Sequence, residues 1–511
     1  MFSPIFAAGY AETHYKFRLP WSPLHKPWPE IFLDAPSRVE PRMPWPVWLV
    51  LRDANLFPVK IHEIELTISA EGWPLSIQTI GIDTLFAEPF HFFPLNVDLG
   101  GRKGNVKVLA KIKASRAGSH IPREFQEWNY PGLAPWPLQV LSQEHPTPKP
   151  AGWWAGETHC HTWHSSDPVE FGAPPQVLQQ SAKVLGLDYV FCTDHSYDFA
   201  FRTDDYRIPA NPQLRWQSLK TECAELAPYP LMVPGEEVSC GNSQGRNVHL
   251  LVPGFSDFIP GMGDSGRRWF RNHPTLSIAE VMERIGDVPC FAAHPQYPMG
   301  LLERMVFRRG PFSSADLHFD REHPICGLEF WNGNRGDGFK AGRNFWIQQL
   351  LNGNSILPLG GNDAHGDLNR FTGVKIPLWS LHSSRARIFG KVRTVLKADA
   401  PQLSVFNLHE SFRRASREAS LYVTDGPTIT LVAQGNGWIA RAFSSPDFGP
   451  IDQITLFTGE AGDSIETRRS FTPGSMEWEM CGTAGHKGSY IRVECRSRLG
   501  YAALTAALFF A

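Results

Sequence analysis

Three segments in the middle of the chain share one pattern, in which a helical stretch leads into a short apolar strand that ends near Asp or His. The helical stretches are PPQVLQQSAKVLG (174–186), SIAEVMERIG (277–286) and RNFWIQQLLNGN (343–354), and the strands that follow are LDYVFCTDH, VPCFAAHP and SILPLGGNDAH. Ser277 and Glu280 have the spacing of a helix capping box. Alternation of helix and strand predicts a parallel sheet or barrel. In such folds the functional groups collect at the carboxyl ends of the strands.

The regions on either side of this α/β zone have the texture of β-sheet. Residues 1–150 contain VWLVLRD, KIHEIELTI and VKVLAKIKA, which alternate apolar and polar residues and predict an antiparallel β-sandwich. The stretch HPTPKPAG (145–152) is rich in proline and predicts a stiff linker. Residues 406–511 again alternate and predict a second β-rich domain. The expected domains are therefore 1–150, 151–405 and 406–511, which agrees with about 150 residues per domain.

Composition limits the partners that the chain is expected to have. Lys and Arg number 49 against 51 for Asp and Glu, giving a net charge of −2, so nucleic acid is not expected as the main partner and a small molecule is favoured. No apolar run reaches the ~20 residues of a membrane helix, and the N-terminus lacks the basic start of a signal peptide. The eight cysteines form no C-x-x-C pair and favour reduced thiols. The expected location is the cytoplasm.

Histidines and carboxylates recur at the ends of the predicted strands. His159 and His161 are two residues apart and would point to the same face of a strand. Imidazole and carboxylate together favour Zn, Mn or Fe over a thiolate site. Buried polar groups need partners, and a metal would satisfy many of them together. The remaining candidates are Asp194, His195, Glu236, Glu237, His249, His294, Asp363 and His365.

The order H-x-H, T-D-H, G-x-E, a lone His, A-H-P and D-A-H resembles the PHP (polymerase and histidinol phosphatase) family over 156–369. The phrase SLYVTDGP (420–427) also resembles the carbaryl-hydrolase-like branch of predicted metal-dependent phosphoesterases. The family resemblance implies an α/β fold, a distorted (βα)7 barrel, with a trinuclear metal centre at the carboxyl ends of the strands. It further implies two to three divalent transition metals per chain.

Carried over motif by motif, the resemblance implies a ligand set for each metal. The first metal would be held by His159, His161 and Asp363, the second by Glu237 as a bridge with His249 and His294, and the third by His195 and His365 with one residue from 164–168. Here the chain departs from the usual S-D-G, because it has His164-Ser165-Ser166-Asp167-Pro168. Asp167 is favoured as the missing ligand, and His164 is its rival.

Four residues beside these ligands have roles of their own, and those of Arg202 and Arg370 are assigned from position alone. Asp194 is either a group in the reaction or a carboxylate that orients a ligand. Glu236 is expected to face away from Glu237, because neighbouring residues of a strand alternate. Arg202 and Arg370 are expected in rim loops, where they would bind phosphate oxygens.

Three functions fit these features. A metal-dependent phosphoesterase that uses a metal-activated water is favoured, and no G-x-S-x-G motif suggests a serine nucleophile. The same metals could hydrolyse carbamate, ester or amide bonds. The third alternative is a non-enzymatic binding protein with a vestigial barrel, against which the complete ligand set argues.

Overall fold

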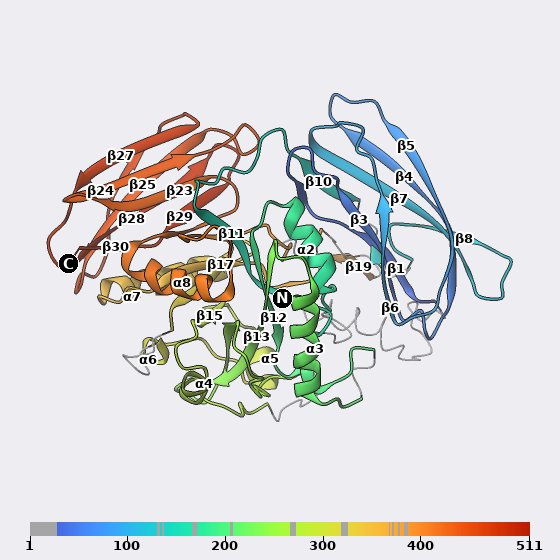
Figure 1. The fold of residues 1–511 in the computed structure, drawn as a ribbon, viewed down its shortest axis with the longest axis horizontal. Coiled ribbons are helices and arrows are strands. Elements are labelled where there is room, and N and C mark those ends of the chain that lie inside the picture. Colours follow the sequence, from blue (N-terminus) through green and yellow to red (C-terminus); the bar gives the residue numbers. More distant parts are fainter. Residues whose placement is uncertain are drawn as a thin grey trace.

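The computed structural model describes most of the chain, and strands predominate over helices in it. The described residues are 28–129, 133–134, 137–165, 171–204, 208–265, 272–317, 325–366, 368–369, 373–376, 379–382 and 387–510. Three parts follow one another along the chain: a β-rich N-terminal part, an α/β centre and a β-rich C-terminal part. The centre lies between the other two (Figure 1).

The N-terminal part consists of two sheets that share one apolar core. One sheet has the order β1-β3-β6, and the other has the order β2-β10-β7-β4-β5 with β8 beside β7. Leu49, Ile64 and Val108, which come from both sheets, are buried in the same cluster. The expected sandwich is therefore present. The strands are β1 (Glu30–Asp34), β2 (Arg38–Val39), β3 (Pro46–Arg52), β4 (Val59–Ala70), β5 (Ser76–Phe86), β6 (Phe90–Asn96), β7 (Gly104–Arg116), β8 (Arg123–Gln126) and β10 (Leu138–Ser142). The short strand β9 (Leu133–Ala134) lies in neither sheet and pairs with β19 (Gly373–Ile376).

A buried carboxyl group in this sandwich gives the first prediction, which concerns stability. Burial raises the pKa of Glu127 to about 8, although its Oε1 accepts a hydrogen bond of 2.6 Å from the Ala110 N–H. The folded state therefore holds a proton that the unfolded chain releases near its ordinary pKa of 4.5, so this group costs stability as the pH rises from about 4.5 to 8. Glu127→Gln keeps the neutral form at every pH. We expect the variant to match the original chain at pH 5 and to exceed it at pH 9 by on the order of 4 kcal/mol.

Thermal unfolding of both proteins at pH 5 and pH 9 measures this difference. An equal destabilisation of Glu127→Gln at both pH values would contradict the prediction.

The central sheet begins with seven consecutive strands in the order β11 to β17. Pairing is parallel from β11 to β13 and from β15 to β17, but β14 is antiparallel to both of its neighbours. The parallel pattern expected from the sequence is therefore wrong at β14. A short turn at 242–246, with no helix, joins β13 to β14, and a tight turn of this length can connect only antiparallel strands. The strands are β11 (Trp153–His161), β12 (Tyr189–His195), β13 (Leu231–Gly241), β14 (Asn247–Pro253), β15 (Phe291–Ala293), β16 (Gly327–Asn332) and β17 (Leu357–Gly361).

After β17, at one end of this set of strands, the chain returns to β11 at the other end. The short strand β18 (Ala364–His365) pairs in parallel with the end of β11, where Cys160 lies opposite Ala364 and His161 opposite His365. The beginning of β11 pairs instead with β21, antiparallel, along Trp153–Gly156. Because β21 occupies that half of the edge, the described strands do not form a complete ring. They do place the carboxyl ends of β11 and β18 side by side.

Helices connect most of the central strands, and their ends follow the sequence signals. The capping box at Ser277 and Glu280 is formed, with the Ser277 N–H donating to Glu280 Oε2 at 2.7 Å. Pro174 precedes α2 as its N-cap, and Gly186 lies just beyond the end of α2 with φ 71°. The helices are α2 (Pro175–Val184), η1 (Asp198–Ala200), α3 (Pro212–Glu225), α4 (Ile278–Ile285), α5 (Leu301–Val306), α6 (Ser314–Leu317) and α7 (Asp337–Leu351).

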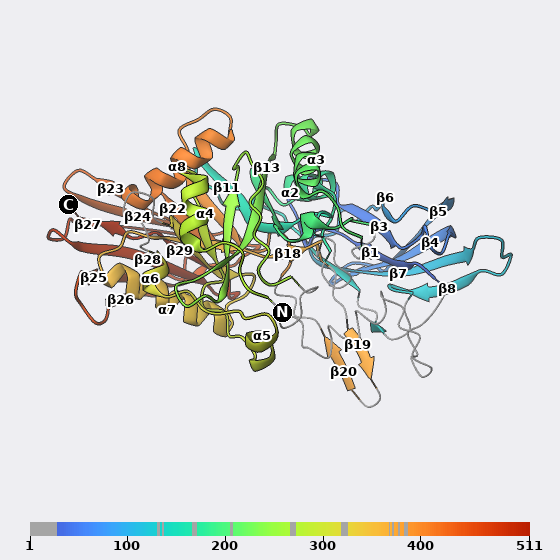
Figure 2. The ribbon, with the colours of Figure 1, turned by 90° about the horizontal axis from the view of Figure 1, so that it is seen from below.

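The C-terminal part continues the central sheet through β21, β22, β29, β28, β25 and β26, and a second sheet of order β23-β24-β27 accompanies it. Leu431 and Val493 of these strands share one apolar cluster with Leu250 and Leu359 of the centre. The elements here are β21 (Arg393–Lys397), α8 (Val405–Glu418), β22 (Leu421–Thr424), β23 (Thr428–Gln434), β24 (Gly437–Phe443), β25 (Ile451–Glu460), β26 (Thr467–Phe471), β27 (Glu477–Thr483), β28 (Ser489–Ser497), β29 (Ala502–Thr505) and β30 (Leu508–Phe509). A further hairpin, β19 (Gly373–Ile376) with β20 (Trp379–His382), projects from the rest of the fold (Figure 2).

The N-terminal sandwich contacts the chain just beyond β18. The Asp34 carboxylate of β1 accepts hydrogen bonds from the N–H groups of Leu368, at 3.1 Å, and Asn369, at 2.9 Å. All eight cysteines have free thiols. No helix in the described part of the chain has the length and apolarity needed to cross a membrane.

Candidate metal centre

A cluster of buried imidazoles and carboxylates lies where the strands of the central sheet end. His159 and His161 end β11, His195 ends β12, and Asp363 directly precedes β18. Glu237 comes from the middle of β13, and it is 1% exposed. The sequence-predicted ligands that the structure brings together are His159, His161, His195, Glu237, His249, His294, Asp363 and His365.

One carboxylate, that of Glu237, lies at the middle of this cluster. Its Oε1 is 2.5 Å from His249 Nδ1 and 3.1 Å from His294 Nε2. Its Oε2 is 3.0 Å from His195 Nδ1 and 3.3 Å from the Nε2 atoms of both His159 and His161. A single buried side chain thus faces five imidazoles. This arrangement suits a carboxylate that bridges cations.

Asp363 provides the second carboxylate of the cluster. Its Oδ1 is 3.2 Å from His161 Nε2, 3.6 Å from His159 Nε2 and 3.7 Å from His365 Nδ1. Its Oδ2 forms an ion pair of 2.8 Å with Arg387 Nη2. Three sets have donor atoms within 4.8 Å of one another: His159, His161, Glu237 and Asp363; His195, Glu237 and His249; and His161, His195 and His365.

These sets agree in part with the assignment that the resemblance implies. The first set contains His159, His161 and Asp363 as expected, with Glu237 in addition. The second set pairs Glu237 with His249 and His195, whereas His294 was expected. His294 lies close by, with its Nε2 atom 3.1 Å from Glu237 Oε1, but no compact set of three donors among the described residues includes it.

Three of the rings are held from behind while their other nitrogen faces Glu237. His159 Nδ1 is 3.0 Å from Glu329 Oε2, and His161 Nδ1 is 3.1 Å from the Ser165 hydroxyl. His249 Nε2 is 3.1 Å from both carboxylate oxygens of Asp264. Such outer contacts fix the tautomer and orientation of metal-binding histidines.

The donor atoms fit a divalent cation. Among the described residues, His159 Nε2, His195 Nδ1 and Glu237 Oε2 are buried and have no hydrogen-bond partner, although the two nitrogens lie 3.3 and 3.0 Å from the Glu237 oxygen. Buried polar atoms without partners are costly, and few remain so in native proteins. Zn, Mn and Fe accept this mixture of nitrogen and oxygen donors. The residues present therefore fit the metals that the sequence predicts.

Electrostatics inside the cluster keep the carboxylates ionised. Burial by itself would raise the pKa of Glu237, but the imidazoles of His249, His195 and His159 hold that pKa well below its usual range. Burial would likewise lower the pKa of His161 and His249, but neighbouring carboxylates outweigh it and raise both to about 9. Without metal, protons on the imidazoles thus balance the negative charge of the carboxylates. A cation that binds these nitrogens would displace the protons.

Two of the cluster residues have an uncommon backbone conformation. His294 has φ 32° and Asp363 has φ 50°. A non-glycine residue in this region is strained unless its surroundings enforce it, and such residues gather at functional sites. Both residues place a side chain toward Glu237 or its neighbours, so the backbone here is shaped to present donors.

The other sequence-predicted residues lie elsewhere. Asp194 Oδ1 accepts hydrogen bonds from the N–H groups of Thr162 and Ser165, so it fixes the chain after β11 and is not aimed at the centre of the cluster. Arg202 is half exposed, pairs with Asp204 and lines a separate surface hollow. Arg370 and Asp167 lie outside the described residues.

Glu236 and His164 point away from the cluster, each toward partners of its own. Glu236 accepts hydrogen bonds from the Ser196 hydroxyl and the Ile259 N–H, in line with the expected alternation along β13. His164 Nε2 is 3.0 Å from Glu222 Oε1, and Arg215 Nη2 donates to the His164 carbonyl oxygen at 2.9 Å.

The position of His164 gives a prediction about the third metal site. Because Glu222 and Arg215 hold His164, we expect His164→Ala to keep its full metal content and Asp167→Ala to lose about one ion per chain. Elemental analysis of the two purified variants would measure this. Loss of an ion from His164→Ala alone would assign the ligand to His164, and full retention in both would remove residues 164–168 from the site.

Four further residues of the site were not predicted from the sequence: Asp264, Arg309, Glu329 and Arg387. Arg309 and Arg387 line the same pocket as Glu237, His249 and Asp363. Arg309 and Arg387 come from segments without a recognisable motif, and Asp264 lies in a loop. Glu329 was discoverable in principle, because GLEFWN is an apolar strand with a single charged residue.

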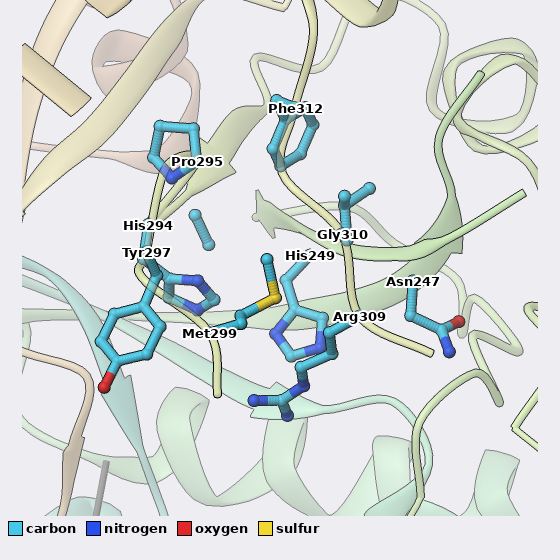
Figure 3. A pocket seen from close by; sticks show the side chains of 11 residues that line it. Asn247, His249, His294, Pro295, Tyr297, Met299, Arg309, Gly310 and Phe312 are labelled. Carbon is cyan, nitrogen blue, oxygen red and sulfur yellow. The ribbon is translucent and has the colours of Figure 1, made fainter. Parts of the chain in front are cut away.

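A neighbouring pocket opens beside this one and is shown in Figure 3. Its lining includes His249, His294, Tyr297, Met299 and Arg309. A further cavity shares His294, Tyr297 and Arg387 with the metal pocket and adds Phe330 and Phe339. The metal cluster therefore borders cavities that are lined by both aromatic and arginine side chains.

The chain matches no known family model and no curated protein sequence. Among solved structures, the β-glucuronidase of Bacteroides uniformis is 11% identical, with 94% of this chain covering 60% of that one at a TM-score of 0.19. The β-D-mannosidase of Dictyoglomus thermophilum is 9% identical, with 95% of this chain covering 67% of that one at a TM-score of 0.17. The chain thus spans about 60% of the length of the glucuronidase. At these TM-scores the likeness carries no argument about fold or activity.

Proposed function

We propose that this chain is a metal-dependent hydrolase of phosphoesters, with a distorted (βα)7 barrel of the PHP type as its catalytic part. The observation that carries the proposal is the Glu237 carboxylate, which faces five imidazoles in a buried site. Several donors that converge on one carboxylate are expected where two or more cations share a ligand.

The chain would hold two to three divalent ions of Zn, Mn or Fe. The ligands of the first ion would be His159, His161, Glu237 and Asp363. The second ion would be held by Glu237 and His249, together with either His195 or His294. The third would be held by His365 and Asp167, together with either His195 or His161. Such ions lower the pKa of a water molecule toward neutrality and offset charge on phosphoryl oxygens.

The side chains around the cluster would orient the reactants. Glu329, Ser165 and Asp264 hold the rings of His159, His161 and His249, so the donor nitrogens keep their direction. Burial of Glu237 and Asp363 excludes bulk water from their carboxylates. Interactions between charges are stronger in such a site than in water.

Charge in the pocket favours a phosphoester over a neutral carbamate or carboxylic ester. Arg309 and Arg387 line the pocket together with the metal-site residues. Guanidinium groups bind phosphate oxygens with two parallel hydrogen bonds and stabilise their charge. Arg387 pairs with Asp363 and Arg309 with Asp264, and only an anionic substrate would add a further charged partner to these two guanidinium groups. The cavity beside the pocket, whose lining mixes Tyr297 and Phe339 with polar side chains, would take the remaining part of the substrate.

The reaction class can be tested with chromogenic substrates. We expect the metal-loaded protein to hydrolyse p-nitrophenyl phosphate or bis(p-nitrophenyl) phosphate faster than p-nitrophenyl acetate, relative to each uncatalysed rate. The protein after chelation is the control. Preference for the acetate or for an aryl carbamate would assign the site to carbonyl substrates. Full metal content without hydrolysis of any of these would favour a binding protein.

A further inference from the structure

One carboxylate behind the metal cluster contacts two residues of different kinds. Asp264 is 2% exposed, and both of its oxygens lie 3.1 Å from His249 Nε2. The same carboxylate accepts a hydrogen bond from the Ser239 hydroxyl and another from Arg309 Nε. Asp264 therefore joins a predicted metal ligand to a cation of the pocket wall.

The backbone around Arg309 is fixed as well. Arg309 forms a parallel bridge with Asn247 at the start of β14, and the Gly310 N–H donates to the Asn247 carbonyl oxygen at 3.0 Å. A side chain at Gly310 would meet Arg246 Cβ at 2.6 Å, so this approach requires glycine. Both the main chain and the Nε end of the guanidinium are thus held in place, and Figure 3 shows the Arg309 side chain beside the His249 ring.

Asp264 determines where the Arg309 guanidinium lies in the pocket. Arg309 is 22% exposed and lines the pocket in which the carboxylates of Glu237 and Asp363 lie. A mobile arginine there would pair with those carboxylates and compete with cations for them. Asp264 takes the Nε side of the guanidinium and so keeps it on the pocket wall. A guanidinium anchored in this way is preorganised, and less entropy is lost when it binds an anion.

We propose that Arg309 binds the anionic group of the substrate at a point that the metals do not occupy, and that Asp264 is the positioning residue that sets it there. This inference rests on the proposed function for the identity of the reaction, but it concerns anion binding and can be tested separately. Inorganic phosphate, the product of a phosphomonoesterase, is the probe.

Calorimetric titration of the metal-loaded protein with phosphate gives the first test. A charge-assisted hydrogen bond to a buried partner corresponds to roughly 10-fold to 100-fold in affinity. We expect Arg309→Met to weaken phosphate binding by about that factor with metal content unchanged, and Arg309→Lys to restore part of the loss. Arg304→Met, an exposed arginine in the last turn of α5, is the matched control and should bind phosphate normally.

A double-mutant cycle tests the role of Asp264. If Asp264 acts through Arg309, then Asp264→Asn weakens phosphate binding on its own but adds little to Arg309→Met, within about 3-fold. Losses that multiply in the double variant would overturn the positioning role. Unchanged phosphate affinity in Arg309→Met would overturn the anion site, whether or not Asp264→Asn folds.

These outcomes separate this inference from the proposed function. A protein that shows the coupled losses but hydrolyses no phosphoester supports the anion site and refutes the reaction. A protein that hydrolyses phosphoesters while Arg309→Met keeps its KM and its phosphate affinity supports the reaction and refutes the anion site.

Discussion

Glu237→Gln is expected to lower the rate of hydrolysis by at least ~100-fold and to release metal. A fall of this size is expected when a metal ligand or its close support is lost. The substitution keeps the shape of the side chain and removes the charge that five imidazoles face at 2.5 to 3.3 Å. A neutral amide cannot bridge two cations as a carboxylate does. Turnover and elemental analysis of the same preparation measure both effects.

The adjacent residue provides a matched control. Burial raises the pKa of Glu236 to about 8, so that side chain is largely neutral at pH 7. In Glu236→Gln, the amide oxygen can accept from the Ile259 N–H and the amide nitrogen can donate to the Ser196 hydroxyl, which replaces both present contacts. Glu236→Gln should therefore be mild. If the two variants behaved in reverse, the assignment of the bridge to Glu237 would be wrong.

Asp363→Asn is expected to have an effect of similar size, for a different reason. Asp363 contributes Oδ1 to the set with His159 and His161, and its Oδ2 pairs with Arg387. Asn tolerates a positive φ as Asp does, so the backbone at φ 50° should be kept. We expect loss of about one ion per chain and a fall in turnover of at least ~100-fold, measured as for Glu237.

Asp53→Asn controls for the backbone in this experiment. Asp53 also has a positive φ, of 62°, but it lies at the end of a strand of the N-terminal sandwich. Asp53→Asn should keep full activity and metal content. Full metal content in Asp363→Asn would show that Asp363 is not a ligand.

Much of the ligand set could be predicted because each donor follows or lies in an apolar strand. His159, His161, His195 and Asp363 stand at strand ends, where the chain direction alone brings polar groups to one edge of the sheet. The capping box at Ser277 could be predicted because it is local: its two partners are three residues apart in the sequence.

The residues that the sequence did not indicate are joined through long-range contacts. Glu329 meets His159 across 170 positions, and Arg387 reaches Asp363 from a segment without a motif. The antiparallel strand β14 was missed because NVHLLVP is as apolar as the parallel strands, and periodicity does not give direction. The role expected of Arg202 came from position alone, and its side chain pairs with Asp204 instead.

Elemental analysis of protein purified without chelator tests the central claim most directly. The buried donors around Glu237 predict two to three transition-metal ions per chain, with the unfolding temperature falling when they are removed, because a ligand that binds only the folded state stabilises it. Less than about half an ion per chain, even after reconstitution with Zn, Mn and Fe, would contradict the metal centre and the hydrolase built on it.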